Sequence, residues 1–191
     1  MPVRKLRKPP TPLDAGELLA YAARILSARA QTTSELREKL RKKAAQRDDV
    51  DEVLTKLKEL GYINDQRFAE SFATWQRDNQ GLGKTRVVRD LMARRVAPVV
   101  AKQAAEDAFR EADELAMIQS FLDRKFRGKN LATMLSYRNP DHDKNLASAF
   151  RKLRTAGFST GNSIRVLKKY SSEADRLEEM QTEEADERAA E

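Results

Sequence analysis

Hydrophobic residues recur every three to four positions along almost the whole chain, which is the spacing of one face of an α-helix. In the segment GELLAYAARILSAR, for example, Leu18, Ala22 and Ile25 share one face. The segment TTSELREKLRKKA places Thr32 three residues before Glu35, which is the spacing of a helix-capping box. No segment shows the sustained polar–apolar alternation of a strand. The pattern therefore predicts an all-α fold.

Three such helices, joined by short turns, form a unit that occurs three times. The segments that correspond to the first helix of each unit start near residues 16, 65 and 113, a spacing of about fifty residues that suits helical repeat arrays. A unit of this size cannot bury its apolar face alone, so we expect an elongated array of three tandem three-helix repeats. The predicted parts are a basic, proline-rich N-terminal tail at 1–13, repeats at 14–63, 64–112 and 113–172, a loop inserted into the third repeat at 127–143, and an acidic C-terminal tail at 173–191.

The sequence GLGKT at residues 81–85 is similar to the end of a phosphate-binding loop. That motif requires a glycine where this chain has Asp78, whose carboxylate would repel phosphate. A phosphate-binding loop also follows a buried strand, whereas in this chain the segment that precedes GLGKT has the apolar stripe of a helix. We therefore interpret Gly81 and Gly83 as the close of one helix, with Thr85 near the start of the next, and expect Lys84 not to bind nucleotide.

Composition and charge narrow the classes of function. The 191 residues include no cysteine, which excludes disulfides and thiolate chemistry, and no apolar run approaches membrane-spanning length. The start of the chain is unlike a secretory signal, so we expect a cytoplasmic protein without membrane contact. Residues 1–172 carry 35 basic and 21 acidic side chains, whereas residues 173–191 carry two basic and nine acidic side chains. This basic body favours a polyanionic partner or an acidic protein surface, with a merely solvated helical surface as the alternative.

Three segments together carry a resemblance to a known family. They are TTSELREKL, VLTKLKELGYINDQRFAESFA and GLGKTRVVRDLMARRVAPVVAKQA, and their most specific part is LGYINDQRFA. In these segments the chain resembles the RecX family of regulators of the RecA recombinase, and AGFSTGNSIRVL is similar to the family's final helix pair. The chain departs from the family pattern in the turn AAQRDD, in Arg95 where glycine is usual, and in the long loop at 127–143.

The resemblance implies a non-enzymatic regulator, and we expect a monomer without cofactor or metal. Its implied partners are the RecA filament and single-stranded DNA, with double-stranded DNA as a further candidate. In the groove of that filament it would inhibit ATP hydrolysis and strand exchange, and so modulate DNA repair and recombination as part of the SOS response. The alternative is a sequence-independent nucleic-acid-binding helical protein that ignores RecA, and an enzyme has the least support.

Two groups of residues with candidate chemistry have plainer explanations. Phe68, Phe72 and Trp75 could stack on bases, but their helical spacing predicts that they are core residues. His142 lies between Asp141 and Asp143 in the predicted loop. Adjacent side chains seldom converge on one ion and the chain has no second histidine, so we expect no metal site and no catalytic residue there.

Basic side chains opposite the apolar helix faces are the candidate contacts to RecA or DNA. A helical rotation of about 100° per residue places three clusters on exposed faces of the second and third repeats. These candidates are Arg86, Arg89 and Arg94; Lys144, Arg151 and Lys152; and Arg165, Lys168 and Lys169.

Overall fold

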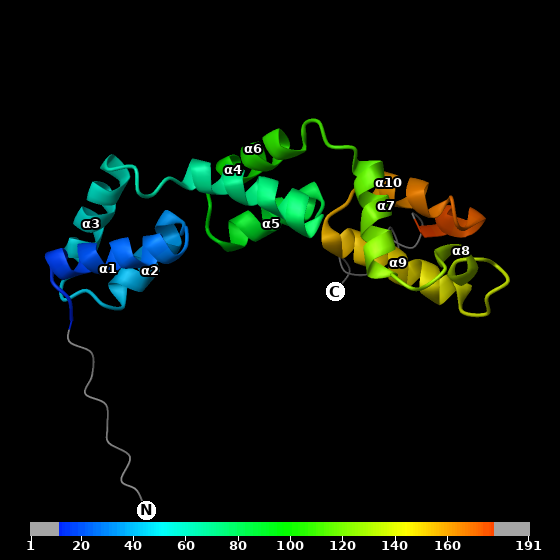
Figure 1. The fold of residues 1–191 in the computed structure, drawn as a ribbon, viewed down its shortest axis with the longest axis horizontal. Coiled ribbons are helices and arrows are strands. Elements are labelled where there is room, and N and C mark those ends of the chain that lie inside the picture. The colour runs from blue at the N-terminus through cyan, green and yellow to red at the C-terminus, as the bar shows by residue number, and fades with distance from the viewer. Residues whose placement is uncertain (1–11, 178–191) are drawn as a thin grey trace, which may run out of the picture.

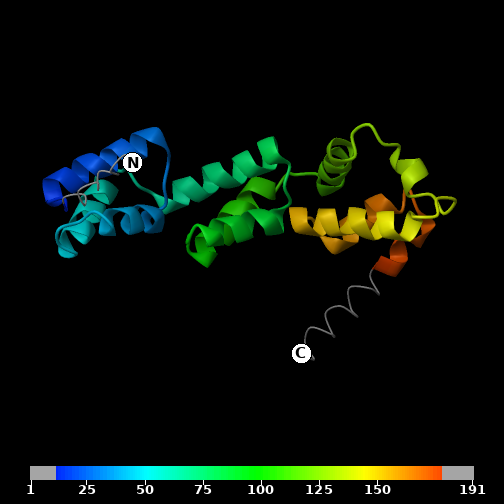
Figure 2. The same cartoon turned by 90° about the horizontal axis from the view of Figure 1, so that it is seen from below.

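The computed structural model describes residues 12–177 as a row of short helices (Figures 1 and 2). They are α1 (Ala15–Ala28), α2 (Thr33–Arg41), α3 (Asp48–Glu59), α4 (Asp65–Trp75), the π-helical turn η1 (Gln76–Gln80), α5 (Lys84–Ala93), α6 (Pro98–Phe109), α7 (Glu114–Lys125), α8 (Leu131–Met134), α9 (His142–Ala156), α10 (Thr160–Leu167) and the 3-10 turn η2 (Ser172–Asp175). Within this range the only β-type pairing is one bridge between Leu13 and Ala44. The prediction of an elongated all-α repeat array is confirmed.

Side-chain caps fix where several helices begin. Asp14 with Glu17, and Thr32 with Glu35, form complete capping boxes at α1 and α2, so the box predicted at Thr32 is confirmed. Pro98 is the first residue of α6, where its missing amide hydrogen costs nothing. These local signals place the helix ends without help from distant contacts.

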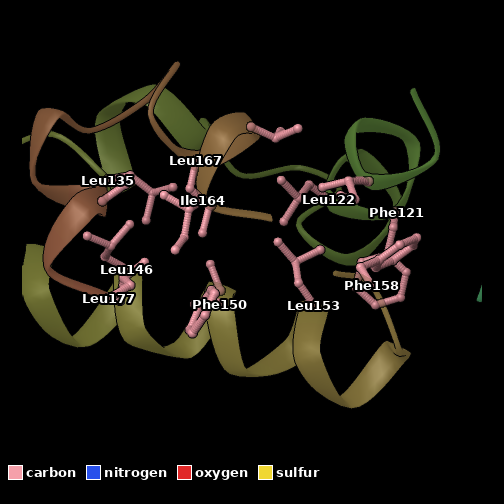
Figure 3. Close-up of a cluster of buried hydrophobic side chains, with 14 of the residues drawn as sticks. Phe121, Leu122, Leu135, Leu146, Phe150, Leu153, Phe158, Ile164, Leu167 and Leu177 are labelled. Atoms are coloured by element: carbon pink, nitrogen blue, oxygen red, sulfur yellow. The ribbon is translucent and has the colours of Figure 1, made fainter. Parts of the chain in front are cut away.

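The apolar faces of the helices form three separate cores. The first lies among α1, α2 and α3, the second among α4, α5 and α6, and the third among α7, α8, α9, α10 and η2. We call these parts unit 1, unit 2 and unit 3; the exact domain boundaries given above remain a prediction. The third core is the largest, and in it the rings of Phe121 and Phe158 meet edge to face with centroids 5.5 Å apart (Figure 3).

In unit 2, α4 packs against α6 through small residues, and this makes one sequence prediction wrong. Helix α4 buries Ala69 and Ala73 toward α6, whose own buried residues are all alanines. The predicted aromatic stripe lies one position away from this face, so Phe68 and Phe72 pack only at its edge. Trp75 is not a core residue, because half of its surface (50%) is exposed.

The GLGKT segment joins unit 2 to unit 3. Gly81 ends η1 with a left-handed φ of 57°, as the sequence predicts. Gly83 does not close that helix but is the N-cap of α5, and Thr85 lies in the first turn of α5 as predicted. The amide of Gly83 donates to the carbonyl of Ala156 (2.8 Å) and the amide of Thr85 donates to that of Gly157 (3.2 Å). The N-terminus of α5 therefore contacts the C-terminus of α9, an arrangement that the helix dipoles favour. Lys84 pairs with Glu106 at 2.5 Å.

Arg94 and Arg95 join unit 2 to unit 1. The Thr32 hydroxyl donates to the Arg94 carbonyl (3.0 Å), and the Arg94 guanidinium lies 3.6 Å from Glu35 and over the rings of Phe68 and Phe72. Arg95 pairs with Glu38 at 3.2 Å and has a φ of 61°, the only positive φ outside glycine in residues 12–177. A positive φ of this size is one that favours glycine over residues with a Cβ.

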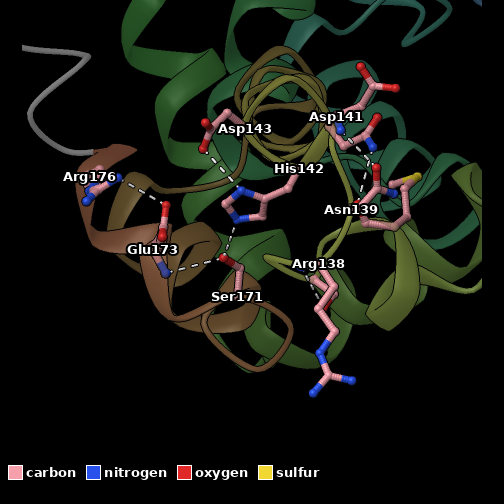
Figure 4. A network of polar contacts seen from close by, with 11 residues as sticks. Arg138, Asn139, Asp141, His142, Asp143, Ser171, Glu173 and Arg176 are labelled. Carbon is pink, nitrogen blue, oxygen red and sulfur yellow. Dashed lines mark hydrogen bonds and ion pairs between the residues drawn. The ribbon is translucent and has the colours of Figure 1, made fainter.

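The last described residues close the third core. Leu177 is 3% exposed and Ala174 is fully buried, although the sequence pattern assigns both to the acidic tail. His142 is buried at the first turn of α9 rather than in a loop, with Nδ1 3.1 Å from Asp143 and Nε2 3.1 Å from the Ser171 hydroxyl (Figure 4). The remainder of the predicted tail, with Met180, lies outside the described residues, as do residues 1–11.

Candidate functional site in a groove between units 2 and 3

A groove lies where η1 and α5 of unit 2 meet α7 and α9 of unit 3. Its volume is about 740 Å³. Among the described residues that line it there is no carboxylate, and five carry positive charge. The five are Arg86, Arg124, Lys125, Arg151 and Lys152, and we call this site the basic groove.

The α5 and α7 cations differ in how free they are to bind a partner. Arg86 forms an ion pair with Asp90 (2.8 Å) and donates to the Thr155 carbonyl (3.4 Å), so its charge is largely compensated. Arg124 donates to the Gln80 carbonyl (2.5 Å), which fixes its guanidinium across the junction without neutralising it. Arg124 and Lys125 both lie against the ring of Phe121, at 5.7 and 5.8 Å from its centroid.

The α9 cations project from the other side. Lys152 donates to the Ser148 hydroxyl (2.6 Å) and lies 5.4 Å from the centre of the Phe126 ring. Arg151 is exposed and makes no side-chain bond within residues 12–177. Arg124, Lys125, Arg151 and Lys152 thus form no ion pair with any described residue. Four like charges at one groove attract an anion with several negative groups.

The structure brings together three of the nine sequence-predicted candidates, namely Arg86, Arg151 and Lys152. Of the remaining six, Arg89, Lys144, Arg165 and Lys169 are exposed on α5, α9, α10 and just after α10, and they lie outside the basic groove. Lys168 is compensated by Asp175 at 2.5 Å. Arg94 is half-buried in the contact between units 1 and 2, so we assign it a structural role.

Arg124 and Lys125 are groove residues that sequence reasoning missed. They stand together at the end of α7, in the sequence LDRKF, between the apolar residues of the helical stripe. An adjacent basic pair on a helix end was the available signal, but only the tertiary structure shows that the pair faces α9 across the groove.

One group of side chains has the composition of a metal site. His142, Asp143 and Glu173 offer ligand atoms within 4.8 Å of one another. Both ring nitrogens of His142 are already used, by Asp143 and Ser171, and the Ser171 hydroxyl also accepts from the amide of Glu173 (Figure 4). The side chains that could ligate a metal therefore serve to attach η2 to α9, which is a structural use.

Among residues 12–177, no helix is long and apolar enough to span a bilayer.

The fold and the site define the class: an all-helical repeat protein that presents a basic groove at a junction between units. Two family models match this chain, described as the first three-helix domain of RecX at residues 19–57 and the second at residues 64–104. Each match falls on one of the observed helix triplets, units 1 and 2. The chain belongs to the RecX family.

Relatives with this name support the assignment. A protein named regulatory protein RecX from Amycolatopsis mediterranei is 36% identical over 110 residues, which is 56% of this chain and 63% of that protein. Another, from Streptomyces coelicolor, is 28% identical over 149 residues and aligns with 78% of this chain and 74% of its own. The crystal structure of RecX from Lactobacillus salivarius has a similar fold, with a TM-score of 0.63 at 22% identity over 82% of this chain and 96% of that one.

Proposed function

We propose that this protein is a non-enzymatic regulator that binds the filament of RecA on single-stranded DNA and inhibits its ATP hydrolysis and strand exchange. Membership of a family of regulatory proteins supports a regulatory role. The observation that carries the proposal is the basic groove. Its four uncompensated cations attract a partner that carries several negative groups.

The cations of the basic groove are carried on elements that contact one another directly. Arg124 is bonded to the backbone of unit 2, and Arg151 and Lys152 lie one helical turn before the α9 terminus that holds α5. The charges are thus carried on elements whose mutual position is fixed by backbone hydrogen bonds. Little order has to be imposed when the groove binds, so more of the electrostatic attraction remains as affinity.

The phosphates of the filament's DNA and acidic side chains of RecA could both occupy the groove. Contact with phosphates predicts that log K falls steeply with log[salt], with a slope of roughly one for each phosphate neutralised. Contact with carboxylates of RecA predicts a shallower slope. The salt dependence of binding to assembled filaments therefore distinguishes the two contacts within the same proposed function.

The test is to titrate the full-length protein into RecA that hydrolyses ATP on single-stranded DNA. We expect inhibition at ratios well below one molecule per RecA, because a molecule bound in a filament affects more than one subunit. Inhibition only at amounts that saturate the DNA would instead support the alternative, a nucleic-acid-binding protein without RecA specificity. No inhibition at any ratio would contradict the proposal.

A further inference from the structure

A second groove lies between units 1 and 2 and has a different chemistry. Its volume is about 760 Å³, and four aromatic residues line it: Tyr62, Phe68, Phe72 and Trp75. They are a third of the twelve aromatic residues in the chain. Two of these side chains remain largely open to solvent, since Tyr62 is 64% and Trp75 is 50% exposed. We call this site the aromatic groove.

The inner part of the aromatic groove is rigid. The rings of Phe68 and Phe72 stack with centroids 5.8 Å apart and an interplanar angle of 17°. The Arg94 guanidinium covers both rings, at 5.5 and 4.9 Å, and is held by Glu35 of unit 1. Trp75 lies two helical turns beyond Phe68 on α4, which is roughly 10 Å along the helix axis. The exposed rings thus extend a platform that packing already orders.

The charge of the aromatic groove is positive. Arg29, Arg67 and Arg94 line it, and none of the described lining residues is acidic. Arg94 is paired with Glu35, and Arg67 donates to the Gly61 carbonyl at 3.1 Å, which orients it without neutralising it. The Arg29 side chain makes no ion pair within the described part of the chain. Flat rings beside uncompensated guanidinium groups suit a ligand that is both anionic and aromatic.

We propose that the aromatic groove binds unpaired bases of single-stranded nucleic acid, with Trp75 and Tyr62 as stacking residues and Arg29 and Arg67 beside the phosphates. Stacking platforms combined with positive charge are the usual means of binding single strands without sequence preference. A groove for an apolar peptide would instead offer aliphatic pockets for anchoring side chains. Here the aliphatic lining is limited to Leu26 and Ala30.

Because Trp75 is the only tryptophan in the chain, its fluorescence reports directly on this contact. Oligothymidylate added to the full-length protein, without RecA, should quench the Trp75 emission in a saturable way. An abasic oligonucleotide of the same length and charge should cause little quenching, since it offers phosphates but no bases. Equal quenching by both oligonucleotides would contradict stacking.

Variants then separate stacking from charge. Because the Trp75 variants lack the tryptophan, affinity is measured from the fluorescence anisotropy of a labelled oligothymidylate, with the wild type measured in the same way. Trp75→Ala should weaken binding by roughly 5- to 150-fold, as for the loss of one stacked base, and Trp75→Phe should restore part of it. Tyr62→Ala should also weaken binding, whereas Tyr137→Ala, which removes a 72% exposed tyrosine of unit 3, is the matched control and should not. Unchanged affinity in Trp75→Ala would overturn the proposal.

The same variants show whether a protein occupies the groove instead. If Trp75→Ala leaves oligothymidylate binding unchanged but abolishes inhibition of RecA, the groove binds a protein partner and the stacking proposal is wrong. The fluorescence titration contains no RecA, so it can succeed even if the proposed regulation of RecA fails. Circular dichroism of each variant checks that the helices are intact.

Discussion

Replacing Gly157 by alanine tests whether a close backbone contact fixes unit 3 to unit 2. Gly157 ends α9 with a φ of 90°, in the left-handed region that favours glycine. A Cβ at this position would lie 2.2 Å from the amide nitrogen of Arg86 and 2.4 Å from its Cβ, whereas ordinary contacts begin at 3.4 Å. The start of α5 would therefore have to move by about 1 Å, since backbone atoms form most of the obstacle.

The expected loss of stability has three contributions. An L-residue in the left-handed conformation costs about 1–2 kcal/mol. Overpacking against a backbone that cannot rotate away costs about 1–3 kcal/mol. Alanine also reduces the entropy of the unfolded chain, which offsets about 0.4–1 kcal/mol. Gly157→Ala should thus lower the free energy of unfolding by about 1–4.5 kcal/mol.

Two other glycines separate these contributions. Gly128 has a φ of 82°, but a Cβ on this residue would have nothing within 4 Å, so Gly128→Ala carries the conformational cost alone, about 1 kcal/mol or less. Gly83 has a φ of −78°, yet its Cβ would lie 2.3 Å from the Gly157 carbonyl oxygen. Gly83→Ala therefore carries the steric cost without the left-handed cost, which after the same gain from the unfolded chain is up to about 2.5 kcal/mol.

The assay combines urea unfolding with amide hydrogen exchange. In the wild type, the Gly83 and Thr85 amides should be protected, because they donate to Ala156 and Gly157. Gly157→Ala and Gly83→Ala should speed their exchange, and Gly128→Ala should not. If Gly83→Ala keeps wild-type stability and wild-type exchange at Thr85, the close contact does not exist and the reasoning is refuted.

Three further substitutions test other parts of the structure. Arg95→Gly should raise the free energy of unfolding by about 0.5–1 kcal/mol, because it removes the strain of a φ of 61° and loses only an exposed ion pair with Glu38. A lower midpoint of urea unfolding would refute this. Burial alone would raise the pKa of Glu114, but hydrogen bonds from Ser159 and Asn162 hold this pKa below the ordinary 4.5. The ionised Glu114 therefore contributes its full stabilisation of the fold above pH 4.5, and the contribution is lost as the pH falls through the lower pKa of the folded state. Glu114→Gln should make the free energy of unfolding depend less on pH in the acid range, and an unchanged dependence would contradict this role of Glu114. Leu177→Ala should lower stability by about 2–4 kcal/mol in calorimetry, whereas an unchanged melt would place Leu177 outside the core.

Local signals in the sequence are enough to predict the helices and their grouping. The capping box at Thr32, the first-turn proline at Pro98 and the glycine at 81 each act within a few residues of the chain. The three-fold recurrence of the helical stripe predicts this grouping. It does not predict that each group buries a core of its own, because a unit of this size is expected to pack its apolar face against its neighbours.

The face that α4 buries, and the contacts between units, cannot be predicted in the same way. The stripe of Phe68, Phe72 and Trp75 has the period of a buried face, but the neighbouring stripe of Ala69 and Ala73 packs more closely against the alanines of α6. Periodicity alone favours the larger residues, so it wrongly predicts that Trp75 is buried. It likewise predicts a free cation at Arg94, because nothing local indicates that Glu35 of unit 1 lies within reach.

The basic groove is predicted only in part for a related reason. A helical wheel shows that Arg151 and Lys152 are exposed, and both are. It does not show which exposed cations of different helices face one another, since this depends on the angle between units 2 and 3. The two units are in close backbone contact at Gly83 and Gly157, where neither residue has a side chain to signal the contact.

The most direct test of the proposed function is the RecA ATPase on single-stranded DNA, measured with a charge-reversed groove. The variant is Arg151→Glu/Lys152→Glu, and the matched control is Lys56→Glu/Lys58→Glu on the exposed face of α3 in unit 1. All four positions are exposed, so the free energy of unfolding should change by no more than about 0.5 kcal/mol per site. We predict that the groove variant loses inhibition of RecA and that the control keeps it. Full inhibition by the groove variant would contradict the account.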